Sequence, residues 1–514
     1  MRQYETFELT FHGQEPEGSQ SSVDLSVIFT LNGVQKSVKG FYAGNGKYKV
    51  RYFPKEQGRC SWQTVTCLEL DGQLSGIEEC ESADTSAHGM VKADGIHLKY
   101  EDGTRYIAVG TTVYAMVHQK KELVEETFGT LEKTPFNKIR FCVFPKHYDF
   151  NHNEPELFAF EKTDGQWDVN RPCFAFWDMF EEQIRRLGRM GIEADLILFH
   201  PYDHWGFAQM SKADCFIYLD YLLRRLSAIP NLWWSLANEY DLMDHFDRSW
   251  WAEFAEYIHE NDPYGHMLSN HHCITQWDFS NENTTHCCLQ SSAVVRTPDF
   301  QDKYGKPVIF DECCYEGNIA YNWGNISGRE MVNRFWITFV LGGYCTHGET
   351  IAENGDLNDD IVLWWAKGGV LRGESSERIA FLRKIMEELP GDLDPVRSMW
   401  DRKSMLEKMK DPETAAMVPT VVKEIMKMPE EDFQNFMDGN REIAGHCGES
   451  VYMQYYAEHC TCIGSLLLPK EYKYDVEVID TWEMTRRKVL SDVSGNVRVS
   501  LPGKEGMLVM AKRV

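Results

Sequence analysis

The 514-residue sequence lacks long apolar runs, and no window approaches the roughly 20 apolar residues that a membrane-spanning helix needs. The opening residues, Met1 to Thr6, lack the apolar core of a secretion signal. Basic residues are scarce beside acidic ones, 53 against 79, and the net charge of −26 would repel a nucleic-acid backbone. These deficits argue against a membrane, exported or nucleic-acid-binding protein and predict a cytoplasmic one.

Several catalytic motifs are also missing. The sequence has no Gly-rich phosphate loop between a strand and a helix and no Gly-x-Ser-x-Gly elbow. No paired Cys-x-x-Cys motif supports a zinc site. Nucleotide-dependent and serine-hydrolase chemistry are therefore not predicted, and we expect no cofactor and no metal.

The composition is that of a globular protein, with 43% hydrophobic and 26% charged residues, and the length suggests two to four domains. The 15 cysteines include the adjacent pairs Cys287-Cys288 and Cys313-Cys314, in which a bridge between neighbours would be strained. Reduced thiols in a reducing compartment fit better. The sequence does not indicate how many subunits assemble, and a homo-oligomer is one of the options.

Residues 1–90 have the pattern of short antiparallel strands. Apolar and polar residues alternate, as in Tyr48 to Phe53, and Asn32-Gly33 and Asn45-Gly46 are hairpin turn signals. This pattern predicts an N-terminal β-sandwich.

Residues 91–392 alternate short apolar runs with amphipathic stretches such as Phe174 to Met190 and Cys215 to Leu226, as a βα repeat requires. Eight such units favour an α/β fold of the (β/α)8 or TIM-barrel type over an open sheet. The eight predicted strands are Arg105–Thr111, Asn137–Phe144, Ala194–Pro201, Leu232–Asn238, Met267–Asn270, Thr285–Gln290, Pro307–Asp311 and Tyr344–His347.

Residues 393–514 lose the βα rhythm. The Met-rich stretch Met405 to Met437 reads as helical with breaks at Pro419 and Pro429. Alternating strands then return and predict a small C-terminal β-domain, with strands at Val451–Glu458, Tyr472–Ile479 and Val497–Leu501.

Two predicted barrel strands end in a carboxylate. The fourth leads into Asn238 and Glu239, and the seventh leads into Glu312. Because functional residues of TIM barrels lie at the carboxyl ends of the strands, the two glutamates should face each other across one site. A pair of carboxylates roughly 5 to 5.5 Å apart is the geometry of a retaining glycosidase, and Asn238 would bind the sugar hydroxyl beside the anomeric carbon.

These motifs resemble the retaining glycoside hydrolases of clan A, and the three-part chain is similar to poorly characterised barrel glycosidases with appended domains of unknown function. The resemblance implies that Glu239 is the acid/base and Glu312 the nucleophile. It also implies that Arg140, on the second strand, hydrogen-bonds the nucleophile and keeps it ionised. A cation beside Glu312 should lower the pKa of that carboxyl, whereas the charge of Glu312 should raise the pKa of Glu239.

The chain departs from the clan in two places. The clan often has a tyrosine near the sixth strand and a tryptophan on the eighth, but Leu289-Gln290-Ser291 and Thr346-His347-Gly348-Glu349 stand there. The wall that faces the sugar is therefore expected to be unusual, and no substrate is carried over from the clan.

Other strand ends offer aromatic and polar side chains that suit sugar recognition, although a structural role stays open for each. The candidate contacts are His200, Tyr202 and Trp205 after the third strand, His271 and His272 after the fifth, His347 and Glu349 after the eighth, and the loop residues Trp277 and Trp323. Asp311 and Glu316 are rival carboxylates near Glu312. Strand alternation predicts that Asp311 turns away from the barrel axis, and Glu316 is a candidate for lining the site.

The predicted function is a cytoplasmic, exo-acting, retaining glycoside hydrolase that acts on short oligosaccharides or plant-derived glycosides. A metal-dependent barrel hydrolase would use the histidines after strands three, five and eight. Adjacent residues on a strand point to opposite faces, however, so neither His271-His272-Cys273 nor His286-Cys287-Cys288 can direct all its members at one ion. A non-catalytic carbohydrate-binding protein is the other alternative, and the flanking β-domains either bind sugar or stabilise the barrel.

Overall fold

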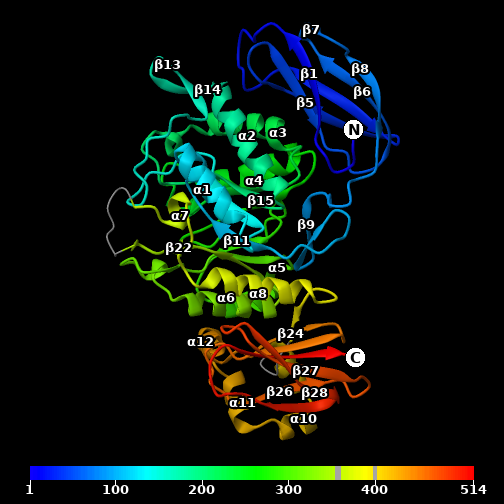
Figure 1. The fold of residues 1–514 in the computed structure, drawn as a ribbon, viewed down its shortest axis with the longest axis vertical. Helices are drawn as coiled ribbons and strands as arrows, with labels where there is room; N and C mark the ends of the chain where they lie inside the picture. Colours follow the sequence, from blue (N-terminus) through cyan, green and yellow to red (C-terminus); the bar gives the residue numbers. More distant parts are fainter. Residues whose placement is uncertain (354–360, 397–401) are drawn as a thin grey trace.

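The computed structural model describes residues 1–353, 361–396 and 402–514. Figure 1 shows a central barrel of strands and helices with a blue N-terminal β-unit against one flank. The orange and red C-terminal unit lies against the opposite flank, beyond α6 and α8. The structure therefore has a TIM barrel with flanking β-domains, as the sequence predicts.

The N-terminal unit consists of two four-stranded antiparallel sheets with strand orders β4-β5-β1-β7 and β3-β2-β6-β8. Asn32 and Gly33 join β2 to β3 with φ of 51° and 85°, the left-handed conformation that a tight hairpin needs. The bounds are β1 Phe7–Gly13, β2 Leu25–Leu31, β3 Val34–Lys39, β4 Phe41–Tyr42, β5 Lys47–Tyr52, β6 Gly58–Thr66, β7 Leu70–Asp71 and β8 Ser75–Cys80, followed by the hairpin β9 Val91–Asp94 and β10 His97–Tyr100.

Eight parallel strands form the barrel in the order β17-β16-β15-β12-β11-β21-β19-β18, so every predicted strand is present. The gap between the end strands is bridged by the N–H of Thr285 to the carbonyl of Leu268 at 2.8 Å and by Ser269 Oγ to the carbonyl of His286 at 2.7 Å. The bounds are β11 Val109–Thr112, β12 Lys138–Cys142, β15 Glu193–Phe199, β16 Leu232–Ala237, β17 Met267–Ser269, β18 Cys287–Gln290, β19 Val308–Glu312 and β21 Tyr344–His347. We call the carboxyl ends of these strands the mouth.

Helices surround the barrel because each buries one apolar face against the strands. They are α1 Lys121–Leu131, α2 Phe174–Arg189, α3 Lys212–Leu226, α4 Trp250–Asn261, α5 Thr297–Tyr304, α6 Gly328–Val340, α7 Trp364–Lys367 and α8 Ser375–Glu387. Two short pairs of strands decorate the loops, β13 Phe160–Thr163 with β14 Gln166–Pro172 and β20 Glu316–Gly317 with β22 Glu349–Thr350.

The C-terminal part begins with four short helices, α9 Arg402–Lys408, α10 Pro412–Met417, α11 Thr420–Met426 and α12 Glu430–Asn440. Pro419 and Pro429 stand at the N-caps of α11 and α12, where their lack of an N–H is harmless. A six-stranded sheet and a two-stranded sheet complete this part. Their strands are β23 Asp394–Pro395, which precedes the helices, and β24 Ile443–Cys447, β25 Val451–Tyr455, β26 Ile463–Leu468, β27 Tyr474–Asp480, β28 Thr485–Val493, β29 Gly495–Ser500 and β30 Met507–Arg513.

Both flanking units contact the barrel through side chains away from the mouth. From the N-terminal unit, Arg51 donates to Glu181 of α2 at 2.8 Å. From the C-terminal unit, Trp482 packs under the guanidinium of Arg378 at 3.6 Å, and Tyr455 hydrogen-bonds Asn333. These contacts attach both β-units to the outer helices of the barrel.

Two further findings concern the whole described chain. Among the residues described, no helix combines the length and the apolar character that crossing a membrane requires. All 15 cysteines are free thiols, with Cys67, Cys460 and Cys462 exposed to solvent.

Candidate active site

A cavity of about 390 Å³ opens at the mouth of the barrel. Every residue that lines it comes from the barrel and its loops, and none from the flanking β-units. The lining residues are Tyr114, Lys146, Tyr148, Asp149, Phe150, Tyr202, Asn238, Glu239, Gln290, Glu312, Tyr315, Tyr321, Trp323 and Trp365.

Glu239 follows β16 and sits in the left-handed region with φ of 56°, an unfavourable conformation for a residue with a side chain. Its carboxylate accepts hydrogen bonds from Asn238 Nδ2 at 3.2 Å, from Gln290 Nε2 at 3.2 Å and from the hydroxyl of Tyr202. Three donors from different strand ends therefore fix its position in the cavity.

Glu312 is the last residue of β19, and its side chain also lines the cavity. The hydroxyl of Tyr114 donates to Oε1 of Glu312 and lies 2.8 Å from Asn238 Oδ1. Arg140 Nη1 and His271 Nε2 lie 3.9 and 3.8 Å from the same Glu312 oxygen. Tyr114 thus connects the two strand ends that carry the glutamates.

Burial, and secondly the charge of Glu239, raises the pKa of Glu312 to about 7, although Arg140 opposes this. Arg140 thus acts in the expected direction and lowers the pKa of Glu312, but burial and Glu239 outweigh it. The physical reason is that two buried carboxylates share one cavity, so the first to ionise raises the pKa of the other. The carboxyl group of Glu312 therefore exchanges its proton close to neutral pH.

Asp311 lies one residue before Glu312 and points into the barrel, not away from its axis as strand alternation led us to expect. Its carboxylate accepts hydrogen bonds from Lys138 Nζ at 2.7 Å and from Thr346 Oγ1 at 2.7 Å. Burial alone would raise the pKa of Asp311, but Lys138 and then Arg140 hold it well below its usual range. With Asp195, 2.6 Å from Lys138 Nζ, these residues form a buried charge cluster beneath the mouth.

Among the predicted contacts, Asn238, Tyr202 and Trp323 line the cavity. Trp323 stacks on Tyr321 with ring centroids 5.4 Å apart. Arg140 is fully buried behind Glu312 and does not reach the cavity wall. Asn238, Tyr202 and Trp323 can therefore contact a molecule in the cavity, whereas Arg140 can act only on Glu312.

The four predicted histidines are buried, and one of them, His271, lies beside a wall residue, 3.8 Å from Glu312 Oε1. His200 Nε2 hydrogen-bonds the carbonyl of Phe144 at 3.2 Å, and burial lowers the pKa of His200 to about 3. His347 stacks on Phe136 at 4.9 Å, and burial likewise lowers its pKa to about 3. His271 and His272 are 0% and 7% exposed. None of the four lines the cavity, because loops and neighbouring side chains cover them.

Three other predicted side chains also lie outside the cavity lining. Trp277 is buried edge-on against Tyr240 at 5.4 Å. Trp205 donates through Nε1 to Glu154 at 2.9 Å. Glu349 accepts the backbone N–H groups of residues 372 and 373 at 2.8 and 2.7 Å. They anchor the loops around the site.

Glu316 does not line the site either, contrary to the sequence-based interpretation. Its carboxylate accepts the backbone N–H groups of Glu374 at 2.7 Å and Ser375 at 3.2 Å. Glu374 is the N-cap and Ser375 the first residue of α8, so Glu316 places a favourable negative charge at the N-terminus of this helix.

The sequence-based interpretation missed most of the wall. Tyr114 and Lys146 follow the first and second strands closely and carried the same signal as Asn238, a polar residue just after an apolar run. The sixth-strand position is Gln290, which binds Glu239 directly. Besides Trp323, a second indole reaches the cavity, that of Trp365 from α7, beyond the end of β21. The aromatic wall also contains Tyr148, Phe150, Tyr315 and Tyr321.

In the part of the chain that the structure describes, one group has the spacing of a metal site: Glu316, His347 and Glu349, whose ligand atoms lie within 4.8 Å of one another. Both carboxylates already accept backbone N–H groups, so an ion would compete with these bonds. The histidines after strands three, five and eight do not form a common ligand group among the described residues. The chemistry of this donor set fits a loop anchor better than a metal centre.

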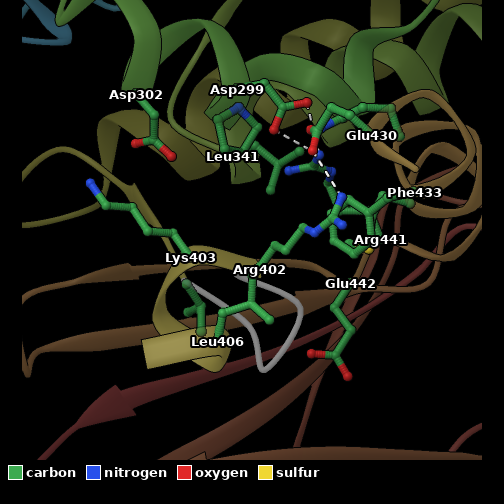
Figure 2. Close-up of a pocket in the computed structure, with 14 residues that line it drawn as sticks. Asp299, Asp302, Leu341, Arg402, Lys403, Leu406, Glu430, Phe433, Arg441 and Glu442 are labelled. Atoms are coloured by element: carbon green, nitrogen blue, oxygen red, sulfur yellow. Dashed lines mark hydrogen bonds and ion pairs between the residues drawn. The ribbon is translucent and has the colours of Figure 1, made fainter. Parts of the chain in front are cut away.

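A larger cavity of about 570 Å³ lies between α5 and the helices α9 and α12, as Figure 2 shows. Its charged side chains form ion pairs across the cavity, Arg402 with Glu430 at 2.8 Å and Arg441 with Asp299 at 2.8 Å. The cavity shares no lining residue with the one at the mouth. The first pair joins α9 to α12, and the second joins the end of the helical segment to α5 of the barrel. We interpret it as a structural junction.

The barrel and the two carboxylates at its mouth define the class of TIM-barrel glycoside hydrolases. A crystal structure of a protein from Bacteroides vulgatus, assigned as a glycoside hydrolase, is 31% identical with a TM-score of 0.85 and covers 100% of this chain and 99% of its own. A family 5 glycoside hydrolase from the same species is 15% identical with a TM-score of 0.60, covering 83% of this chain and 94% of its own, and shares the fold. No curated protein matches the chain.

A family model described as the apiosidase-like catalytic domain matches residues 92–390. Two models of domains of unknown function, DUF5060 and DUF5605, match residues 1–66 and 441–512. The chain belongs to the apiosidase-like family, and it is a glycosidase. The helices α9 to α12 lie between the regions matched by the catalytic-domain model and by DUF5605.

Proposed function

We propose that the protein is a retaining glycosidase in which Glu312 is the nucleophile and Glu239 the acid/base. The observation that carries this proposal is that two carboxylates from opposite sides of the barrel enter one cavity, each held by a tyrosine hydroxyl. Since the raised pKa belongs to Glu312, the roles of the two glutamates rest on their strand ends and contacts and not on this pKa.

The mechanism has two steps. Glu312 attacks the anomeric carbon while Glu239 protonates the departing oxygen, which leaves a glycosyl-enzyme ester. Glu239, now ionised, takes a proton from water, which attacks the same carbon and releases Glu312. The side-chain amide of Asn238 hydrogen-bonds the hydroxyl beside the anomeric carbon. This contact strengthens as positive charge develops on the sugar ring.

The substrate we propose is a short oligosaccharide or a plant-derived glycoside cleaved from its end. The cavity volume of about 390 Å³ is near the lower end of the roughly 300–1,000 Å³ typical of small-molecule sites. This size supports exo action on one or two rings over binding of a long polymer. Trp323 and Tyr321 offer stacked aromatic faces to the leaving group.

We further propose that the enzyme works in a reducing compartment, the cytoplasm, on imported substrates. The 15 free thiols, three of them exposed, support this assignment because exposed thiols persist best where glutathione keeps them reduced.

The test is hydrolysis of a panel of aryl α- and β-glycosides by the wild type, Glu312→Ala and Glu239→Ala. The panel includes furanosides, and apiosides in particular, because of the name of the family. We expect release by the wild type and loss of at least about 10⁴-fold in Glu312→Ala. Azide should restore turnover in Glu239→Ala and give a glycosyl azide of retained configuration.

Glu316→Gln is the matched control, because it removes a nearby carboxylate outside the cavity and should keep the wild-type rate. Inverted configuration in the first product would refute the retaining mechanism. Hydrolysis unaffected by both alanine variants would refute the assignment of the two glutamates.

A further inference from the structure

Lys146 is a buried cation in the active-site cavity that none of the roles above uses. Its side chain is 2% exposed, yet it lines the cavity. No carboxylate in the described part of the chain lies within 4.0 Å of its ammonium group, unlike Lys138, which contacts two. Buried cations are normally paired, so an ammonium held in this place calls for a functional explanation.

Aromatic rings hold the ammonium group in place. Lys146 Nζ lies 3.5 Å from the ring centroid of Tyr114, 4.2 Å from that of Tyr202 and 4.7 Å from that of Tyr148. Such cation–π contacts partly replace the hydration that the ammonium loses on burial. They also fix the positions of the tyrosine rings relative to the cation.

Two of these rings belong to the tyrosines that hold the glutamates. The hydroxyl of Tyr114 donates to Glu312, and the hydroxyl of Tyr202 donates to Glu239. Lys146 therefore lies between the two phenols, one for each carboxylate. Arg140 does not lie between the two glutamates in this way. It is 3.9 Å from Glu312 and 3.5 Å from Asp195, and among the described residues it has no ion pair with Glu239.

In the proposed mechanism the single negative charge of the pair moves. It resides on Glu312 before the first step, and on Glu239 once Glu312 is esterified. We propose that Lys146 is a positioning residue that holds Tyr114 and Tyr202 against the two glutamates and stabilises this one negative charge on either of them. The inference rests on the proposed retaining mechanism.

The balance of charges around the cavity favours Lys146 as the counter-charge of the glutamate pair over Lys146 as a binding site for an anionic sugar. Lys138 and Arg140 are balanced by Asp195 and Asp311. The one charge left on the glutamate pair is then balanced by Lys146. A further anion on the substrate would disturb this neutrality and would meet the charge of the nucleophile.

The groups that face Lys146 come from several strand ends. They are Tyr114 after β11, Arg140 and Cys142 of β12, Tyr148 in the following loop, Tyr202 after β15, Glu239 after β16 and Glu312 of β19. The charge of Lys146 also acts on His200 and His271. Burial raises the pKa values of Cys142 and of the three tyrosines and lowers those of the two histidines, whereas Glu312, with a pKa of about 7, exchanges its proton in the pH range of a glycosidase assay.

The test compares Lys146→Met, which removes the charge, with Lys146→Arg, which keeps it. The pH profile of kcat/KM is measured on the aryl glycoside that the wild type hydrolyses. Removing a cation raises the pKa of a carboxylate, so in Lys146→Met both limbs should move up by about one pH unit. On the acidic limb kcat/KM then falls about tenfold at fixed pH. Lys146→Arg should lower the rate without moving the limbs.

Lys162→Met is the matched control, because Lys162 packs over the ring of Trp167 at 4.3 Å on the β13–β14 hairpin, outside the cavity. It should leave both limbs unchanged. A purely structural role of Lys146 predicts a lower rate with limbs at the wild-type pH, and that result would overturn the inference. Loss of activity in both glutamate variants would show, in the same experiment, that the proposed function still holds.

A second measurement needs no substrate. ¹³C NMR of glutamate-labelled protein, with Glu239→Gln and Glu312→Gln used for assignment, reports the titration of the pair directly. We expect the upper titration of the pair to move to higher pH in Lys146→Met and to stay in place in Lys146→Arg. An unchanged titration in Lys146→Met would overturn the inference even if no glycoside in the panel were hydrolysed.

Discussion

Asp311 and Glu312 are neighbours on β19, and the interior of the barrel and its mouth treat their carboxyl groups in opposite ways. The carboxylate of Asp311 contacts Lys138, which with Arg140 holds its pKa well below the usual range despite burial. Burial and then Glu239 raise the pKa of Glu312 to about 7. One strand thus places an ionised group inside and a proton-exchanging group at the mouth.

The two buried lysines repeat this contrast. Lys138 of the interior touches two carboxylates, whereas Lys146 of the mouth is held by aromatic rings. Interior charges are compensated within the protein, which makes them part of the fold. The charged groups that the structure describes at the mouth, Lys146 and the two glutamates, have no direct ion pair with one another. They can therefore change protonation or partner during a reaction, and this costs the protein stability.

The largest effect should come from breaking the interior cluster. Lys138→Met leaves the carboxylates of Asp195 and Asp311 with Arg140 alone in a dry core, and we expect a loss of about 3–5 kcal/mol in the free energy of unfolding. Lys146→Met removes a cation without a carboxylate partner and should change that free energy by less than about 1 kcal/mol. Denaturant unfolding of the two variants beside the wild type measures both.

Comparing the two variants tests whether pairing with carboxylates, and not burial alone, decides how much a lysine contributes to stability in each region. Equal losses in the two variants would mean that burial of any lysine here is what matters. The lower activity expected of Lys146→Met beside nearly unchanged stability would mark it as functional.

Asp311→Asn and Glu312→Gln should change the free energy of unfolding at pH 8 in opposite directions. The pKa of Asp311 is lowered by folding, so its stabilisation is present above its unfolded pKa of about 3.9 and is lost as the pH falls below it. Asp311→Asn should therefore destabilise the protein by about 3 kcal/mol at both pH 5 and pH 8. The pKa of Glu312 is raised by folding, so ionising it costs stability as the pH rises from about 4.5 to about 7.

Glu312→Gln has no such ionisation cost. It should be more stable than the wild type at pH 8, by up to about 3 kcal/mol, and equal to it near pH 4.5. Thermal unfolding at the two pH values measures the difference. A Glu312→Gln variant that is less stable at pH 8 would mean that the carboxylate is compensated like Asp311, and the contrast along β19 would fail.

The barrel could be predicted from the sequence because each strand is a short apolar run between amphipathic stretches. All eight runs became strands, and the two catalytic candidates followed from their places at the strand ends. The C-terminal sheets were predicted less completely. Strand β28, Thr485–Val493, is polar and largely exposed at a sheet edge, so its sequence shows no buried face.

The walls of the site were predicted poorly because position after a strand does not tell which way a side chain points. His200 and His347 follow or end strands as Asn238 does, yet both are buried. His200 hydrogen-bonds the carbonyl of Phe144, and His347 stacks on Phe136. Trp365 reaches the cavity from α7, and no local pattern links it to the end of β21. Such placements depend on loop conformation and on contacts distant in sequence.

A smaller effect than those of Lys138→Met and Asp311→Asn should come from Glu316, a buried carboxylate that belongs to neither region. Its two oxygens accept the first N–H groups of α8, so Glu316→Gln loses charge at a helix N-terminus and keeps one acceptor. We expect a loss of about 1–2 kcal/mol in the free energy of unfolding and an unchanged pH profile of kcat/KM. A shifted profile would place Glu316 with the carboxylates of the mouth, whereas a loss as large as that of Lys138→Met would place it with the interior cluster.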